Sequence, residues 1–465
     1  MFNGDLSKMR LLVTESNMPL AENIYKWVAN ILDYEYRNAE QTLRTLHELS
    51  HVYNPRDFPT REYGMFGEKY QAFLERIDRI NSGLHPALNK ASRTEEVTDY
   101  EIMIFKQDIE SFFDLGRNAF IVTPEREFYS GEIKPRTLGD LRGKNVYVLH
   151  WLSTRDGVYD PNEGAIRLFL INHALSKGGA GRIIDTLMEM PYQRQERKDQ
   201  SRVPISAELM AALTETSVGT TPFNVMTIDL HAPAIQGFFK SPCDNLSSLP
   251  FFAYVAEKEL ESAGIAREDV VAVAADVGAG NRTTAFGKYM RLPEDRIVLS
   301  FKFRPEGGGD AKTKGLMGNT GRVAIVPEDM IDTGGTLKSN IMELVKHGVE
   351  VVYVVAPHGI LSESDMPAEE KLRALNNVEY HTNGTTRKLK FRAIVGDANV
   401  VRDEEYARAN SDWLTIAPVS FIPAMAIRRT QANESSQFLF NRKFLDIYLD
   451  ALDVYNMATA VRSGV

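Results

Sequence analysis

The stretch that decides the fold runs from residue 323 to residue 336 and reads Val-Ala-Ile-Val-Pro-Glu-Asp-Met-Ile-Asp-Thr-Gly-Gly-Thr. Its first four residues are small or β-branched and apolar, which is typical of a buried strand. Acids and a turn of small residues follow, and the pattern from Leu337 to His347 predicts a helix. A strand that leads through a glycine turn into a helix is a building unit of parallel α/β sheets.

The turn in this stretch has the chemistry of an anion site. The glycines at 334–335 let main-chain N–H groups approach a bound phosphate, and two threonine hydroxyls, at 333 and 336, add donors at the positive end of the helix. The acids at 328–329 can accept hydrogen bonds from a ribose diol or hold magnesium. An ordinary strand, turn and capped helix is the plainer interpretation, and a Gly-Gly turn alone would favour it.

Short apolar runs of strand length recur along the chain and alternate with helical patterns. The runs lie at 10–14, 119–123, 145–149, 185–190, 225–229, 270–274, 297–304, 323–326 and 351–355, and the helical patterns at 166–176, 206–213, 251–263 and 337–347. This alternation predicts doubly wound parallel sheets with helices on both faces. In such sheets ligands bind beyond the carboxyl ends of the strands, where most of the motifs lie.

Two stretches interrupt the alternation. Residues 33–115 are charged, aromatic and helical in pattern, without a convincing strand, and residues 363–390 are polar, with Asn383-Gly384 as a turn signal. Neither stretch contains a cluster of residues suited to chemistry. We therefore interpret both as insertions that serve packing or assembly.

Composition excludes several classes of protein. The chain has 465 residues, 43% of them hydrophobic and 25% charged, so disorder, collagen and coiled coil are poor explanations. The net charge of -9 shows no basic excess, and we expect no nucleic-acid partner. The single cysteine, Cys243, excludes an internal disulfide and fits a reducing cytoplasm. No apolar run is long enough to predict a membrane span or a secretory signal.

The 323–336 string resembles the phosphoribosyl-pyrophosphate motif of type I phosphoribosyltransferases. Further strings resemble, in the same order, those of ribose-phosphate diphosphokinases (phosphoribosyl pyrophosphate synthetases), and they lie at 9–23, 191–198, 202–207, 228–232, 235–246, 275–282, 358–359 and 427–435. The resemblance implies an α/β fold with a tandem of two type I phosphoribosyltransferase-like domains, at 1–245 and 246–440. It places a helical insertion at about 33–115, a second insertion at about 363–390 and a helical tail at 441–465.

The same resemblance implies an activity. The β,γ-diphosphoryl group of Mg-ATP is transferred to the anomeric hydroxyl of ribose 5-phosphate, giving 5-phosphoribosyl 1-diphosphate and AMP. The cofactor implied is Mg²⁺, the partners are ATP and ribose 5-phosphate, and the enzyme is expected to be a cytoplasmic homo-oligomer. Catalysis of phosphoryl transfer depends mostly on positioning and on neutralising charge, so cations and anion-binding loops are expected rather than a protein nucleophile.

The resemblance also assigns roles to residues. Ribose 5-phosphate is assigned to Glu328, Asp329, Asp332, Thr333, Gly334, Gly335 and Thr336, and ATP to Phe128, Glu132, Arg194, Gln195, Arg197 and His231. His231 and Asp276 are the expected magnesium-linked residues. Lys302 and Arg304 are the expected catalytic cations, since a period of two places them on one face of a strand, beside a glycine-rich stretch at 307–310 that can close over the diphosphoryl group.

Plainer interpretations and departures from the family pattern leave alternatives open. On local charge alone, 194–197 would be a solvated basic face, His231 a core or capping residue, and the Lys302 strand a charged edge. Ser130 stands where the pattern usually has aspartate, and 397–400 differs from the usual Thr-Asn-Thr-Ile. The acceptor is therefore either ribose 5-phosphate or a larger derivative such as ADP-ribose. A non-catalytic regulatory relative is the third hypothesis.

Overall fold

The computed structural model describes residues 9–14, 23–24, 27–28, 30–31, 120–123, 125–137, 141–150, 160–303, 312–318, 320–362, 365–382, 385–398, 404–431 and 435–455. The predicted insertion at 33–115, Arg304 and the glycine-rich stretch at 307–310 lie outside the described residues.

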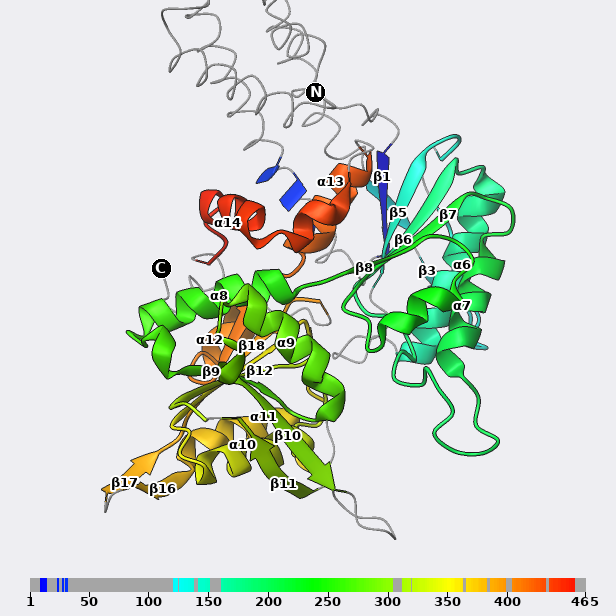
Figure 1. Ribbon diagram of the computed structural model, residues 1–465. Coiled ribbons are helices and arrows are strands. Elements are labelled where there is room, and N and C mark those ends of the chain that lie inside the picture. The colour runs from blue at the N-terminus through cyan, green and yellow to red at the C-terminus, as the bar shows by residue number, and fades with distance from the viewer. Residues whose placement is uncertain are drawn as a thin grey trace, which may run out of the picture.

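The first sheet has the strand order β2-β1-β5-β6-β7-β8, and its neighbouring strands are parallel. The strands are β1 (Met9–Thr14), β2 (Phe120–Thr123), β5 (Asn145–His150), β6 (Arg182–Leu187), β7 (Phe223–Ile228) and β8 (Cys243–Leu246). One face is covered by α6 (Pro161–Gly178) and α7 (Ser206–Ser217), as Figure 1 shows. The Asp160 side chain caps the start of α6 by accepting hydrogen bonds from two main-chain N–H groups. At the other end, Gly179 terminates the helix with a left-handed φ of 83°.

The second sheet has the order β11-β10-β9-β12-β14-β18-β19, with β11 antiparallel at one edge and the other neighbours parallel. Its strands are β9 (Val270–Ala274), β10 (Ile297–Phe303), β11 (Lys312–Met317), β12 (Val323–Pro327), β14 (Val351–Ala356), β18 (Lys390–Gly396) and β19 (Leu414–Ala417). Helices α8 (Leu249–Ser262) and α9 (Gly280–Tyr289) cover one face, and α10 (Gly335–Lys346) and α11 (Ala368–Arg373) cover the other (Figure 1). The predicted doubly wound parallel α/β fold is confirmed.

Smaller elements complete the described chain. They are the hairpin of β3 (Glu125–Glu127) and β4 (Ile133–Pro135), the pair β13 (Met330–Ile331) and β15 (His358–Gly359), the hairpin of β16 (Glu379–Thr382) and β17 (Thr385–Lys388), and helices α12 (Glu404–Ala409) and α14 (Arg442–Ala451). Short 3₁₀ helices lie at 233–238, 267–269, 277–279, 294–296, 374–377 and 436–440. The stretch predicted as the second insertion contains α11 and the β16–β17 hairpin. Its predicted turn residues 383–384 lie outside the described residues.

Helix α13 (Phe421–Gln431) crosses from the second sheet to the inner face of the first. The Gln431 side-chain oxygen accepts hydrogen bonds from Asn145 Nδ2 at 3.1 Å and from the Tyr147 hydroxyl at 3.3 Å, and Phe421 meets Trp27 edge to face. The apolar core is therefore continuous from one sheet to the other through α13 and α8. The predicted domain boundaries at 245 and 440 stay predictions.

None of the described helices is long and apolar enough to cross a membrane.

Candidate active site between the two sheets

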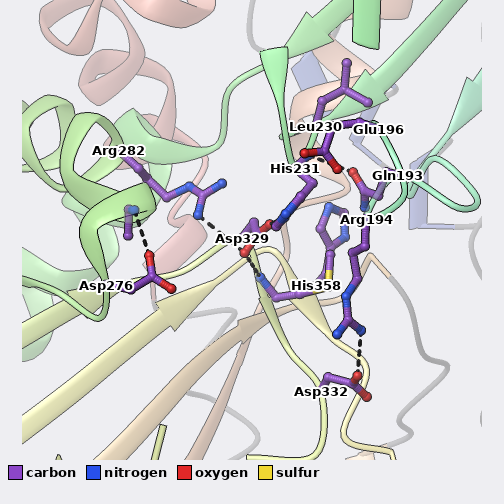
Figure 2. A network of polar contacts seen from close by, with 12 residues as sticks. Gln193, Arg194, Glu196, Leu230, His231, Asp276, Arg282, Asp329, Asp332 and His358 are labelled. Carbon is purple, nitrogen blue, oxygen red and sulfur yellow. Dashed lines mark hydrogen bonds and ion pairs between the residues drawn. The ribbon is translucent and has the colours of Figure 1, made fainter. Parts of the chain in front are cut away.

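The two sheets meet at the carboxyl ends of their strands. His231 follows β7 in the first sheet, and Asp329 follows β12 in the second; His231 Nδ1 lies 2.5 Å from Asp329 Oδ2. Beside this contact, Arg194 donates to Asp332 Oδ2 at 2.7 Å (Figure 2). These two contacts join the segment predicted to bind the nucleotide to the loop predicted to bind ribose 5-phosphate.

The contact between His231 and Asp329 is a hydrogen bond to a buried carboxylate. Asp329 is only 5% exposed, and burial alone would raise its pKa, but the hydrogen bond from His231 and the charge of Arg282 lower it to about 2. Arg282, on α9, lies 3.3 Å from the second carboxylate oxygen. The hydrogen bond to Asp329 in turn raises the pKa of His231. The imidazole and the ionised carboxylate thus form a charge-assisted hydrogen bond across the site.

The loop that carries His231 is held from both sides. Asp229 has a left-handed φ of 41°, a conformation that costs free energy in a residue other than glycine. The Asp229 carboxylate accepts hydrogen bonds from the Ser248 main-chain N–H at 2.9 Å and from its hydroxyl. The next N–H, that of Leu230, donates to Asn245 Oδ1 at 2.9 Å. These fixed contacts impose the turn that aims His231 at the second sheet.

The predicted phosphate loop starts α10 at an exposed position. Gly334 is the N-cap residue with φ 73° and ψ -4°, and no side chain caps this helix among the described residues. Gly335 and Thr336 are exposed, and they lie at the positive end of the helix dipole, where the first main-chain N–H groups have no partner within the helix. Behind the loop lies Leu372 of α11, and a Cβ added at Gly334 would lie in ordinary van der Waals contact with it, at 3.4 Å. The loop thus has the form of an anion site, and Leu372 supports it from the side of α11.

Gln195 and Arg197 lie on the same segment as Arg194 but have local partners. The Ser206 hydroxyl, at the start of α7, donates to Gln195 Oε1 at 2.7 Å. Arg197 Nε lies 3.6 Å from Glu196 Oε1, and its side chain is 82% exposed. The predicted nucleotide segment therefore joins α7 to the inter-sheet contact and presents two arginines to solvent.

Lys302 is the next-to-last residue of β10. Its main chain pairs with that of Thr313 in β11, just after a register irregularity at Phe301. Because β10, β9 and β12 are parallel, the carboxyl end of β10 lies at the same edge of the sheet as Asp276 and Asp329. The strand thus ends at the edge of the sheet where the phosphate loop also lies. The catalytic roles of Lys302 and of Arg304 stay predictions.

Asp276 follows β9 and is exposed, and its Oδ1 accepts a hydrogen bond from the Ala279 N–H at 3.0 Å. In Figure 2 it lies on the Arg282 side of Asp329, while His231 comes from the other sheet. Among the described residues, no three histidine, cysteine or acidic side chains are grouped to hold a metal. The Asp276 carboxylate is an oxygen donor of the kind that suits Mg²⁺, an ion that usually keeps several waters and binds one or two carboxylates together with substrate phosphates.

Phe128 and Glu132 close the β3–β4 hairpin. The Ser130 hydroxyl donates to Glu132 Oε2 at 3.0 Å, and Gly131 takes the left-handed φ of 85° that the turn requires. The Phe128 side chain is 41% exposed. The hairpin therefore presents an aromatic ring and an acid at one exposed tip.

Sequence reasoning gave no role to three residues of this site, Gln193, Arg282 and His358. The fully buried His358 donates through Nε2 to the Ile228 carbonyl at 3.0 Å, and its N–H donates to the Asp329 carbonyl at 3.2 Å, so it joins the ends of β7 and β12. Gln193 accepts a hydrogen bond from the His231 N–H. All three stand in or beside motif strings, but each has its partner on a different loop.

Comparisons with known proteins identify relatives of this chain. Residues 117–217 match the family model described as the N-terminal domain of ribose phosphate pyrophosphokinase. A ribose-phosphate pyrophosphokinase of Hyphomonas neptunium is 31% identical over 318 residues, which cover 68% of this chain and 91% of the relative. That of Bacillus subtilis is 32% identical over 316 residues, which cover 68% and 87%.

A crystal structure of phosphoribosylpyrophosphate synthetase from Mycobacterium smegmatis superposes with a TM-score of 0.55 at 26% identity, covering 70% of this chain and 96% of that one. The parallel sheets, the loop at 323–336 and these likenesses lead to one conclusion. The chain belongs to the ribose-phosphate pyrophosphokinase family and is an enzyme of this type.

Proposed function

We propose that this enzyme transfers the β,γ-diphosphoryl group of Mg-ATP to the anomeric hydroxyl of ribose 5-phosphate, giving 5-phosphoribosyl 1-diphosphate and AMP. The observation that carries the proposal is the 2.5 Å contact between His231 and Asp329. It joins a nucleotide segment on one sheet to a sugar-phosphate loop on the other, which is the geometry that a direct transfer between two substrates requires.

The acceptor binds at the start of α10. The 5-phosphate accepts hydrogen bonds from the main-chain N–H groups of residues 333–336 and from the hydroxyls of Thr333 and Thr336, where the helix dipole favours an anion. The ribose hydroxyls donate to the carboxylates of Glu328, Asp329 and Asp332. Since Asp329 is ionised well below neutral pH, it is an acceptor at physiological pH.

The donor nucleotide binds along the segment after β6. Arg194 and Arg197 provide guanidinium groups for the triphosphate, and Gln195 provides an amide. Phe128 and Glu132 contact the adenine of the ATP that is bound to a neighbouring copy of the chain. The exposure of the hairpin tip supports this contact. On this account the working form is a homo-oligomer, and the single cysteine suits a cytoplasmic enzyme.

His231 and Asp276 would hold the magnesium ion of Mg-ATP. When bound, the ion neutralises charge on the phosphates. The anomeric oxygen forms a bond to the β-phosphorus, the bond from that phosphorus to the oxygen bridging to the α-phosphorus breaks, AMP leaves with that oxygen, and the hydroxyl proton passes to solvent. Lys302 and Arg304 stabilise the negative charge of the transferring group.

An acceptor assay tests this proposal. The purified chain is incubated with Mg-ATP and either no acceptor, ribose 5-phosphate or ADP-ribose, and AMP and the sugar product are separated by chromatography. We expect AMP to appear together with 5-phosphoribosyl 1-diphosphate when ribose 5-phosphate is present, and chelation of magnesium to stop it. Turnover of ADP-ribose alone, or no AMP with any acceptor, would overturn the proposal.

A further inference from the structure

Gln193 makes one well-defined contact, and it is with the main chain of His231. The Gln193 side chain is almost completely buried, at 2% exposure, and its Oε1 accepts a hydrogen bond from the His231 N–H at 2.8 Å. This contact fixes the orientation of the amide, because the amide nitrogen cannot accept a hydrogen bond. The nitrogen is buried without a hydrogen-bond partner among the described residues. A buried unpaired donor is costly, so the oxygen's contact determines how this side chain lies.

The contact links three loops in series. Gln193 immediately precedes Arg194 in the segment after β6, the N–H that it binds belongs to the loop after β7, and the His231 ring reaches Asp329 after β12. Figure 2 shows Gln193 and Arg194 on the same side of His231. Any movement of the nucleotide segment is therefore passed to His231 through one hydrogen bond.

The loop after β7 needs such support. Asp229, two residues before His231, has the strained φ of 41°, and strained residues persist only where surrounding contacts hold them. Asn245 holds the Leu230 N–H from the β8 side, and Gln193 holds the His231 N–H from the β6 side. Without Gln193, the His231 main-chain N–H loses the acceptor that it has among the described residues.

We propose that Gln193 is a positioning residue for nucleotide binding, which holds His231 in register with the neighbouring Arg194 segment. The inference rests on the proposed function, since it takes His231 and Arg194 to contact Mg-ATP. Gln193 acts through His231, so its effect on nucleotide affinity depends on that side chain. A buried glutamine that merely stabilised the fold would not show this dependence.

A double-mutant cycle on Mg-ATP affinity tests the inference. Gln193→Met keeps the size of the side chain and removes the acceptor, and His231→Ala removes the side chain that the acceptor positions. Affinity is measured by calorimetry without ribose 5-phosphate, so inactive variants are measurable. We expect Gln193→Met to weaken binding about fivefold in the otherwise unchanged protein, the value of one hydrogen bond, and less than about twofold in the His231→Ala background.

Asn376→Leu is the matched control. Asn376 Oδ1 accepts the Phe391 N–H at 2.7 Å, which is the same type of contact in the part of the chain that covers the far face of the second sheet. This variant should lower the melting temperature and leave Mg-ATP affinity unchanged. Gln193→Ser, which is too short to reach His231, serves if methionine prevents folding.

Two results would overturn the inference. One is an affinity that does not change in Gln193→Met or Gln193→Ser, and the other is an equal loss with and without the His231 side chain. The acceptor assay on the unchanged protein is read separately. If it releases no AMP while binding Mg-ATP, the proposed function fails and the cycle still decides the role of Gln193.

Discussion

Arg194 donates a hydrogen bond to Asp332 at 2.7 Å, although the two residues are 138 positions apart and lie in loops that follow strands of different sheets. Their side chains are 57% and 28% exposed, and an ion pair this open to solvent contributes little to stability. Its importance is positional. Each partner stands where the proposed substrate brings a group suited to it, phosphates for Arg194 and hydroxyls for Asp332.

Replacing Arg194 by leucine should weaken Mg-ATP binding about tenfold, because a hydrogen bond to a charged group is lost, while the free energy of unfolding changes by less than about 1 kcal/mol. Calorimetry and thermal melting measure the two effects. Arg322→Leu is the control, since Arg322 is 62% exposed and pairs with Glu350 at 3.1 Å outside the site. Equal affinities for the Arg194 variant and the unchanged protein would remove Arg194 from the proposed nucleotide segment.

Replacing Lys302 by alanine should lower kcat about 10²- to 10³-fold and change the KM for either substrate little, since its charge acts on the transition state. Initial rates of AMP release at varied substrate concentrations measure both constants. Lys346→Ala, on an exposed lysine that pairs with Glu343 at the end of α10, should be without effect. Full activity of a combined Lys302→Ala and Arg304→Ala variant contradicts the assigned mechanism.

The support behind the phosphate loop gives a third prediction. Leu372 and Leu375 are both fully buried in the same core cluster, and the three atoms nearest to a Cβ built at Gly334 all belong to Leu372. Each alanine substitution should cost about 2–5 kcal/mol of unfolding free energy. Only Leu372→Ala should also raise the KM for ribose 5-phosphate, by several-fold, with the KM for ATP unchanged. Denaturant unfolding and steady-state kinetics separate these effects, and identical kinetics in the two variants would exclude a role for Leu372 in shaping the loop.

A buried acid in the first sheet predicts a pH dependence. Burial raises the pKa of Asp185 to about 7, although a hydrogen bond from Asn172 Nδ2 at 2.8 Å opposes the shift. Since the folded pKa exceeds the unfolded value, the folded state binds more protons between these two values. The contribution of Asp185 to stability therefore falls as pH rises from its unfolded pKa to about 7, by on the order of 1 kcal/mol per pH unit.

The substitution Asp185→Asn should abolish this fall in stability with rising pH. Its stability advantage over the unchanged protein should grow from pH 4 to pH 7 and level off above, as measured by urea unfolding across this range. Asp199→Asn, at an exposed position, is the control. A stability difference that is the same at every pH would show that Asp185 keeps an ordinary pKa in the folded chain.

The strands and helices of the sheets could be predicted because their signals are local. The run at 323–326 became β12 and the helix at 337–347 became α10, since apolar periodicity and the glycine turn act over neighbouring residues. Boundaries were less accurate. The helix predicted from 166 begins at Pro161, where Asp160 provides the cap, and the run predicted at 185–190 is β6 at Arg182–Leu187.

The contacts of the site depend on pairs that are distant in sequence. The motif strings placed His231 and Asp329 at strand ends, but their 98-residue separation gave no sign that they touch. The same holds for the ring of His358, whose acceptor is 130 residues away. A side chain that holds a distant loop leaves no pattern in the sequence around it. The motifs therefore gave no role to Gln193.

The position of α13 has a consequence for synthesis of the protein. The inner face of the first sheet, including Tyr147, Ile184 and Met226, forms one core with a helix that begins at Phe421. While the ribosome is still making the middle of the chain, this apolar face has not yet received its cover. The first sheet therefore completes this core only after residues 421–431 have emerged from the ribosome.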